Sequence, residues 1–482
     1  MDTGSRAKHV VRGGLATLLG LVLAAPFPGC ARVESPPQPS LVVLISLDTL
    51  RKDAVGAYGG EGGTATPALT RFAGDAVLVE GARTPIPFTL PAHMSLFTGV
   101  APMVHGVSNA SRRLGDAVQT LPEFLRDAGF ATHGIAVNYW MKGAFGFDRG
   151  FDSYELLRES LRPGVRVTRA ALELLDERSE QDEPLFLFLQ FFDAHSASSE
   201  IKASTLPYYS RPGLREGLFS DEADEAFCSP QHGCATGFLV AMNAGDVEVS
   251  QSTLGAIREL YAKSARDLDD QLAAFFEGLR KRGLYDGALI IVVSDHGEEF
   301  REHGRVLHSQ TYEETVAVPL LVKFPGGRWA GRRVTGLAGL TDILPTLLDE
   351  LGLPIPEFVT GESLLPLLEG RSALRDGMVS QDKHRPARFA MVQGDVKLIF
   401  DFESELAELY DLHADPAEQH NLAKEDPVRV AALRTELASR IKGYRALAQT
   451  LGQAPEPPRE PVLTESELDA LHSLGYLREV EN

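Results

Sequence analysis

Side chains suited to binding a divalent cation follow a strongly apolar run, in the segment VVSDHGEEFREHG (292–304). Asp295 offers a hard carboxylate oxygen and His296 an imidazole nitrogen, and together they can hold one cation. Gly297 is expected to let the backbone turn sharply behind them. The segment therefore predicts a metal site at Asp295 and His296.

Two more histidines, His303 and His308, follow closely along the chain. One of them is expected to complete the site, as a third ligand or as a substrate contact. Of the two we favour His308.

A candidate nucleophile lies in FTLPAHMSLFTG (88–99), where Thr89 is expected to begin a short amphipathic helix. A free Thr hydroxyl is a weak nucleophile, but a divalent cation or a helix N-terminus favours its alkoxide. The alternative is that Thr89 only caps the helix, with Pro91 in the first turn. To His93 and His105 we assign structural or supporting roles, because polar side chains near helices are usually satisfied locally.

Three apolar runs are expected to form buried strands, and each is followed by an aspartate. Runs that are apolar on both faces suit strands inside a sheet that helices cover. The runs are LVVLISL (41–47), LFLFLQFF (185–192) and ALIIVVS (288–294), and the aspartates are Asp48, Asp193 and Asp295. Because ligands bind beyond the carboxyl ends of such strands, we expect the carboxylates to converge on a metal site, with room at Asp193 for a second ion. Alternatively, they form turns or caps.

Helix and strand signals alternate along the first 370 residues, which predicts an α/β fold with a mainly parallel sheet. Helices are expected at 121–129 and 253–283, and another strand at 131–138. After residue 370, short strand-like pieces precede a charged helix at 426–446. This change predicts a smaller antiparallel-sheet and helix domain.

The N-terminus resembles an export signal of the lipoprotein type. Basic residues precede an apolar stretch (13–25) that is too short to span a membrane, and PFPGC ends at Cys30. We expect residues 1–30 to be a signal peptide, Cys30 to carry a lipid, and residues 31–40 to be a Pro-rich tether. The protein would then be exported, to a bacterial periplasm or as a membrane-anchored lipoprotein. Simple secretion is the alternative.

The overall charge of the chain limits the classes of partner that it can bind. A net charge of −20 argues against general nucleic-acid binding.

In an oxidising compartment, Cys228 and Cys234 favour a local disulfide, with two free thiols or a metal clip as alternatives. The tail is expected to be extended over 453–465 and to end in a docking helix over 465–477.

Several longer motifs occur together in an order typical of one family. They are LVVLISLDTLRKDAVGAYG, TLPAHMSLFTG, GFDRGFDSY, LFLQFFDAH, SDHGEEFREHG with YEETVAVPLLVKFPG, TDILPTLLDELGLP and ELYDLHADPAEQHNLA. Over roughly residues 40–425, the chain resembles the sulfatase family of the alkaline phosphatase superfamily. The resemblance implies a large catalytic domain with a central mixed, mainly parallel sheet over 41–370. A small C-terminal domain with the tail would occupy 371–482.

The resemblance also implies a ligand set. Asp48, Asp295 and His296 match metal-binding positions of the family. Many sulfatases have a second aspartate beside the first, where this chain has Thr49, so one oxygen ligand is missing.

Residues around the ester are implied in the same way, and several differ from the family. His195, in FFDAH, matches a histidine that touches the ester group, and His308 stands where a lysine usually contacts the sulfate. Asn138 falls near a block whose usual lysine and histidine are absent.

The largest departure is at the nucleophile. Sulfatases have Cys or Ser, then x-Pro-x-Arg, and oxidise the Cys or Ser to formylglycine; this chain has Thr89 and, in place of the arginine, His93. Phosphodiesterases, lipoteichoic acid synthases and phosphoethanolamine transferases of the superfamily use an unmodified threonine there. We therefore predict a metal-dependent hydrolase of phosphate diesters or phosphonate esters. Thr89 would be both nucleophile and metal ligand, and His195 or His308 would protonate the leaving oxygen.

Three alternatives remain open. They are hydrolysis of sulfate esters, transfer of a phosphoryl-linked group to an envelope glycan or lipid, and an inactive relative that binds an anionic glycan or lipid. The expected cofactor is a divalent cation, Ca²⁺, Mg²⁺, Mn²⁺ or Zn²⁺. The expected partner is a small, glycan-linked or lipid-linked anionic ester, with a membrane contact only through the lipid on Cys30.

Overall fold

The computed structural model describes residues 39–452 except for 60–65, 110, 159, 161, 180–181, 198–205, 209–226, 228–233 and 372–374. The predicted signal peptide, Cys30, most of the tether and the tail helix lie outside the described residues. Cys234 is disulfide-bonded. Cys228 lies outside the described residues, so pairing between the two cysteines stays a prediction.

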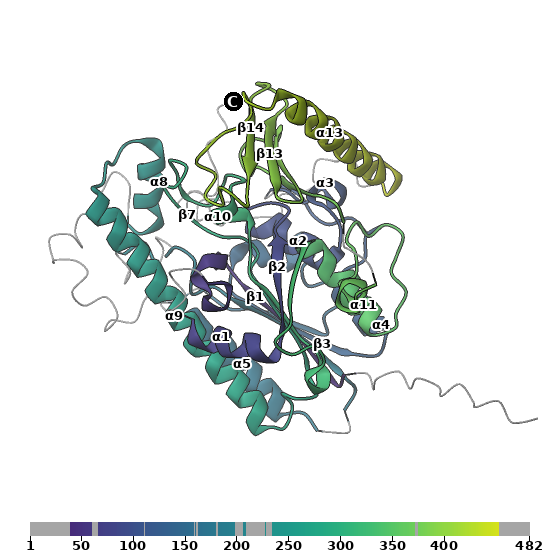
Figure 1. Cartoon of the computed structure of the whole chain (residues 1–482). Coiled ribbons are helices and arrows are strands. Elements are labelled where there is room, and N and C mark those ends of the chain that lie inside the picture. The colour runs from purple at the N-terminus through teal and green to yellow at the C-terminus, as the bar shows by residue number, and fades with distance from the viewer. Residues whose placement is uncertain are drawn as a thin grey trace, which may run out of the picture. The chain divides into compact units, whose positions relative to one another are not determined.

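An eight-stranded sheet forms the centre of the described chain (Figure 1). Only β9 runs antiparallel to its neighbours in this sheet, β2 and β6, and the other paired strands are parallel. The mixed, mainly parallel sheet that the resemblance implied is therefore confirmed. In spatial order the strands are β10 (Arg333–Gly339), β2 (Val77–Arg83), β9 (Leu320–Lys323), β6 (Leu289–Val293), β1 (Leu41–Leu47), β5 (Leu185–Phe191), β3 (Ala131–Ala136) and β4 (Ser153–Leu156).

The central strand β1 is buried on both faces, as its unbroken apolar sequence predicts. Val43 and Ile45 belong to one core layer, and Val42 and Leu44 to the other, because successive side chains point to opposite faces. Helices cover both faces. One core contains residues of α1 (Pro67–Asp75), α5 (Pro163–Asp176) and α9 (Gln251–Lys281), and the other those of α2 (Thr89–Thr98), α4 (Leu121–Asp127) and α11 (Ile343–Glu350).

Several shorter elements lie between these strands and helices along the chain. A two-stranded ribbon of β7 (Glu299–Phe300) and β8 (Val306–Leu307) follows β6. Within the described part of the chain, every helix is too short or too polar to cross a membrane. The remaining short helices are α3 (Pro102–His105), α8 (Thr236–Ala244), α10 (Glu313–Val316) and α12 (Leu365–Leu368).

The C-terminal region forms the predicted antiparallel sheet and helix (Figure 1). Leu433, Leu437 and Ile441 of α13 (Pro427–Thr450) pack into one core with apolar residues of the sheet. The helix runs four residues beyond its predicted end. The four strands are β11 (Met378–Gln381), β12 (Arg388–Gln393), β13 (Val396–Asp401) and β14 (Ala407–Asp411).

A buried ion-pair network joins this second sheet to the eight-stranded sheet and the segment after β8. Lys397 of β13 lies 2.8 Å from Glu418 and 3.0 Å from Glu313, and Glu313 also pairs with Arg83 at the end of β2. Glu313 and Glu418 come from the YEE and DPAEQHNLA motifs. These two motifs therefore have a structural role, since charges this deeply buried are tolerated only when paired.

Candidate metal centre and active site

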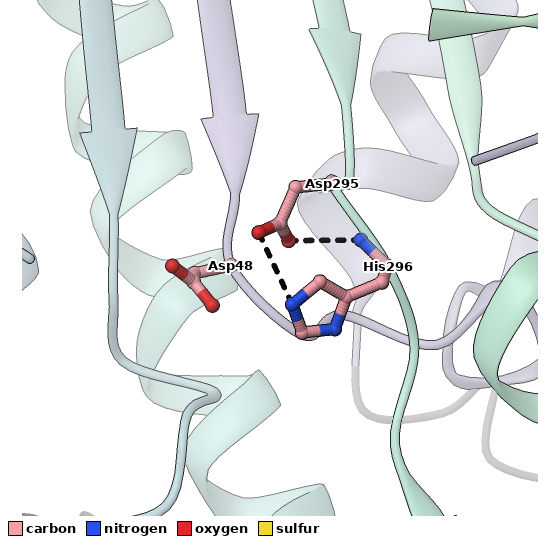
Figure 2. Close-up of side chains that lie close together, drawn as sticks. All are labelled: Asp48, Asp295 and His296. Atoms are coloured by element: carbon pink, nitrogen blue, oxygen red, sulfur yellow. Dashed lines mark hydrogen bonds and ion pairs between the residues drawn. The ribbon is translucent and has the colours of Figure 1, made fainter. Parts of the chain in front are cut away.

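Two neighbouring strands deliver the predicted metal ligands to one point. Asp48 directly follows β1, and Asp295 and His296 follow β6, its parallel neighbour. Their ligand atoms lie within 4.8 Å of one another, and all three side chains are buried (Figure 2). Parallel strands end at the same edge of a sheet, which explains how residues 247 positions apart converge.

Two side-chain amides hold the Asp48 carboxylate in one orientation. Gln190 of β5 donates to Asp48 Oδ2 at 2.8 Å, and Asn138 donates to the same oxygen at 3.4 Å. The other oxygen, Asp48 Oδ1, is buried and accepts no hydrogen bond from the described residues. Two amides thus bind one oxygen and leave the other available to a ligand.

Asp295 and His296 are fixed in the same manner. Backbone amides of Thr49 and His296 donate to Asp295 Oδ1 at 3.1 and 2.9 Å, while buried Oδ2 accepts no hydrogen bond from the described residues. His296 Nδ1 lies 3.0 Å from the Gly297 carbonyl oxygen, so it carries the proton and Nε2 presents a lone pair. That Nε2 lies 3.3 Å from Asp295 Oδ2 (Figure 2).

Thr49 adopts a strained backbone conformation beside this group. Its φ is +59°, in the left-handed region that a β-branched residue seldom occupies. Tyr261 donates to the Thr49 carbonyl at 2.9 Å and stabilises the conformation. The Thr49 hydroxyl is buried without a hydrogen-bond partner among the described residues. It is a third oxygen with unused acceptor capacity at this edge.

The electrostatics of the group fit a bound cation. Burial, and then the negative charge of Asp295, raise the pKa of Asp48 well above its ordinary range. Burial likewise raises the pKa of Asp295 to about 7. Two buried carboxylates that repel each other, each with one oxygen unbonded within the described chain, are compensated when a divalent cation lies between them.

Thr89 lies next to this group, at the start of α2. The N-cap position belongs to Phe88, and Thr89 is the first helical residue, so the interpretation of Thr89 as a simple cap is wrong. Its hydroxyl oxygen lies 3.4 Å from His296 Nε2. All ten residues of α2 are buried, which places the positive end of the helix dipole in a solvent-poor setting at the group.

His93 connects three parts of the site, one helical turn after Thr89. Its Nδ1 lies 2.9 Å from the Thr89 carbonyl oxygen and 3.5 Å from Asp295 Oδ2, and its Nε2 lies 2.8 Å from the Ser46 hydroxyl. Burial lowers the pKa of His93 to about 4, so the ring is neutral at neutral pH. His93 thus fixes the start of α2, with Thr89, to the edge that carries Asp295, in agreement with a supporting role.

Two further histidines border the same space. The His308 ring centroid lies 4.3 Å from that of His296 and 5.4 Å from that of His195. Glu298 contacts His308 Nδ1 at 2.9 Å, and the Ser196 carbonyl contacts His195 Nδ1 at 2.8 Å. Each contact fixes Nδ1, which leaves Nε2 as the atom for proton exchange.

Other predicted residues lie elsewhere. Asp193 does not belong to the group, contrary to our expectation: the Gly164 amide donates to it at 3.2 Å, at the start of α5. The Asp193 carboxylate lies against the start of α5 instead, so the predicted second ion loses its support. His303 binds Glu314 at 2.7 Å instead of facing His296, and His105 contacts Ser95 within the buried helical layer.

Gly297 is required for a different reason from the one predicted. Its φ lies outside the left-handed region, and a Cβ atom there would lie 2.0 Å from the Glu314 carbonyl oxygen. Close approach of two backbone segments, and not a sharp turn, therefore demands glycine.

Sequence reasoning missed three residues of the site: Gln190, Glu298 and Lys383. Gln190 had a usable signal, because it is the one polar residue in the run LFLFLQFF. Glu298 follows the SDHG motif directly but has no pattern of its own. Lys383 comes from the C-terminal sheet, and nothing local predicts that it reaches the site.

An α/β sheet with buried acidic and histidine side chains at its carboxyl edge fits a hydrolase that holds a metal ion there. The profile of the family described as Sulfatase matches residues 40–353, and that of the N-sulphoglucosamine sulphohydrolase C-terminal region matches 301–446. The chain therefore belongs to the sulfatase family.

Individual relatives agree with this assignment. An arylsulfatase of Clostridium perfringens is 23% identical over 84% of this chain and 95% of its own. A protein solved in complex with its substrate D-glucosamine-2-N,6-O-disulfate has a TM-score of 0.65, with 18% identity over 88% of this chain and 99% of its own. A phosphonate monoester hydrolase of Agrobacterium radiobacter has a TM-score of 0.64, with 22% identity over 85% and 96%. These structural similarities establish the fold.

Proposed function

We propose that the protein is a metal-dependent hydrolase of anionic esters in which Thr89 is the nucleophile. The observation that carries the proposal is the position of the Thr89 hydroxyl, 3.4 Å from His296 Nε2 at the edge of the Asp48, Asp295 and His296 group. A helix cap would not require a threonine at this point, because Phe88 holds the cap position.

Asp48, Asp295 and His296 would hold the cation, with the Thr49 and Thr89 hydroxyls as further oxygen ligands. A bound divalent cation would lower the pKa of the Thr89 hydroxyl and neutralise charge on the ester oxygens. The mixed oxygen and nitrogen ligands leave Ca²⁺, Mg²⁺, Mn²⁺ and Zn²⁺ as candidates.

The chain's own residues would perform the remaining steps. Thr89 Oγ attacks the central sulfur or phosphorus atom, and the bond to the leaving oxygen breaks. His195 or His308 would take the Thr89 hydroxyl proton on Nε2 and give it to that leaving oxygen. The same Nε2 would then take a proton from the attacking water and return it to Thr89 Oγ as Thr89 is released. His93 keeps Thr89 aligned with the ligand group throughout.

Sulfate esters are the substrate class that the names of the relatives favour, over the phosphate esters predicted from the sequence. The substrate bound in one structural neighbour is a sulfated sugar, which makes sulfated sugars the first compounds to test. Phosphate diesters and phosphonate esters are the second class. Two phosphonate monoester hydrolases among the neighbours, and a threonine in place of Cys or Ser, favour them.

One panel of assays separates these proposals. The protein, purified without chelator, is analysed for bound metal and incubated with sulfate esters, phosphate monoesters and diesters, and phosphonate esters. We expect turnover of at least one class, and loss of turnover in Thr89→Ala even with enough added metal to keep that variant loaded. Full activity of Thr89→Ala would show that the nucleophile is wrong. Bound metal without any turnover would support the inactive, anion-binding alternative. Product linked to an added glycan or lipid alcohol, in place of free acid, would support transfer.

A further inference from the structure

The C-terminal sheet brings a lysine to the candidate active site. Lys383 follows β11, and β11 is fixed to the segment that leads into α2. In this contact the Ser380 hydroxyl donates to the Thr84 carbonyl oxygen at 2.6 Å. The turn after β11 is closed by Asp382, whose carboxylate accepts from the amide of His384 at 2.9 Å. The backbone around Lys383 is therefore well defined.

Lys383 contacts both sides of the site. Its amide donates to the Ser309 carbonyl oxygen at 3.1 Å, one residue after His308. Its ammonium lies 4.6 Å from the ring centroid of Phe88, one residue before Thr89. The side chain thus extends between the nucleophile and the histidine that borders the metal group.

The charge of this ammonium acts on the site. Burial lowers the pKa of Lys383 to about 8, so it stays largely protonated at neutral pH. An ammonium that lies against Phe88, on a backbone bonded to the residue after His308, can reach an anion bound beside Thr89.

We propose that Lys383 binds the anionic group of the ester, a role that rests on the hydrolase function proposed above. In related enzymes a lysine contacts the sulfate where this chain has His308, an imidazole whose Nδ1 lies 2.9 Å from Glu298. Lys383 supplies the missing positive charge from a different element. Its ammonium donates charge-assisted hydrogen bonds to the non-bridging oxygens of a sulfate, phosphate diester or phosphonate ester.

The test measures anion binding apart from turnover. Inorganic sulfate and phosphate are titrated calorimetrically into the metal-loaded wild type, Lys383→Gln, Lys383→Arg and Lys424→Gln, with metal content and melting temperature recorded for each. Lys424 is an exposed lysine of the same region and serves as the matched control. We expect Lys383→Gln to weaken anion binding by about 10- to 100-fold, as befits loss of a hydrogen bond to a charged group, with metal content unchanged. Lys383→Arg should recover part of the loss, and Lys424→Gln should match the wild type.

The outcomes separate this proposal from the hydrolase function. Wild-type affinity in Lys383→Gln would overturn the role of Lys383 whether or not esters turn over. Weakened anion binding in a protein that hydrolyses no ester would support the anion site and reject the hydrolase. If Lys383→Gln also loses metal, the Lys383→Arg variant decides the question. If that variant is folded and metal-loaded, yet binds the anion as weakly as Lys383→Gln, the proposal is overturned.

Discussion

Replacing Gln190 by methionine tests whether the amide clamp on Asp48 prepares the metal site. The side chain donates to Asp48 Oδ2 at 2.8 Å, and its Oε1 accepts from the amides of Val137 and Asn138 at 3.2 and 3.3 Å. Methionine has a similar volume, so packing is largely preserved while all three hydrogen bonds are lost.

Two effects of different size follow. Loss of a hydrogen bond that orients a ligand typically weakens metal affinity by about 10- to 100-fold. At a fixed excess of metal this removes about 1.4 to 2.8 kcal/mol of metal-dependent stabilisation. Independently, two buried amides lose an acceptor, which costs about 1 to 3 kcal/mol each, with or without metal.

Urea unfolding with excess metal and with chelator separates the two effects. The difference between the conditions gives the metal-dependent part, and a direct metal titration gives the affinity. Gln310→Met is the matched control, because Gln310 donates to the carboxylate of Glu299, outside the ligand group, at 3.0 Å. The reasoning fails if Gln190→Met binds metal as tightly as the wild type. It also fails if Gln310→Met weakens metal binding equally.

Four further outcomes are expected. Thr49→Val, which keeps the shape but removes the unpartnered hydroxyl, should weaken metal binding by about tenfold; equal affinity would exclude the hydroxyl as a ligand. Burial opposes the protonation of His303, but its bond to Glu314 raises its pKa above 6.5. The protonated His303 therefore stabilises the fold fully below pH 6.5, and this stabilisation is lost as the pH rises through the raised pKa. Over that range the free energy of unfolding should fall more in the wild type than in His303→Gln. Parallel pH profiles of the two proteins would contradict this. Cys30→Ala should move the expressed protein from the membrane fraction to the soluble fraction, and unchanged fractionation would reject the lipid anchor. Esters with one negative charge should have higher kcat/KM than phosphate monoesters, measured on aryl substrates with the same leaving group, and the reverse order would refute the charge argument below.

The sequence predicted the parts of the site that are encoded locally. Apolar runs flanked by Asp48 and Asp295 became β1 and β6, because strands buried on both faces need continuous apolar sequence. The same rule was misleading for Asp193, since a side chain past a strand end can be directed to a neighbouring helix. Its carboxylate meets the Gly164 amide instead.

Residues that depend on tertiary contacts could not be predicted in this way. Asn138 was noted only for its place in a motif, yet it binds Asp48 from 90 residues away. Lys383 contacts Ser309 because β11 is fixed along the segment before α2. No periodicity in the sequence predicts that β11 packs there. Local sequence patterns predict the helices and strands. Which side chains orient the metal-ligand candidates depends on how those helices and strands pack together.

The departures from the sulfatase pattern have a shared electrostatic consequence. Where the family has an arginine and a lysine, this chain has His93 and His308, and burial lowers the pKa values of both, so neither carries charge at neutral pH. A divalent cation held as proposed would balance the charges of Asp48 and Asp295, and the Lys383 ammonium would then supply the positive charge that meets the ester. One positive charge matches a sulfate monoester, a phosphate diester or a phosphonate monoester, each of which carries one negative charge. A doubly charged phosphate monoester would leave one charge unmatched in a solvent-poor site, which is costly.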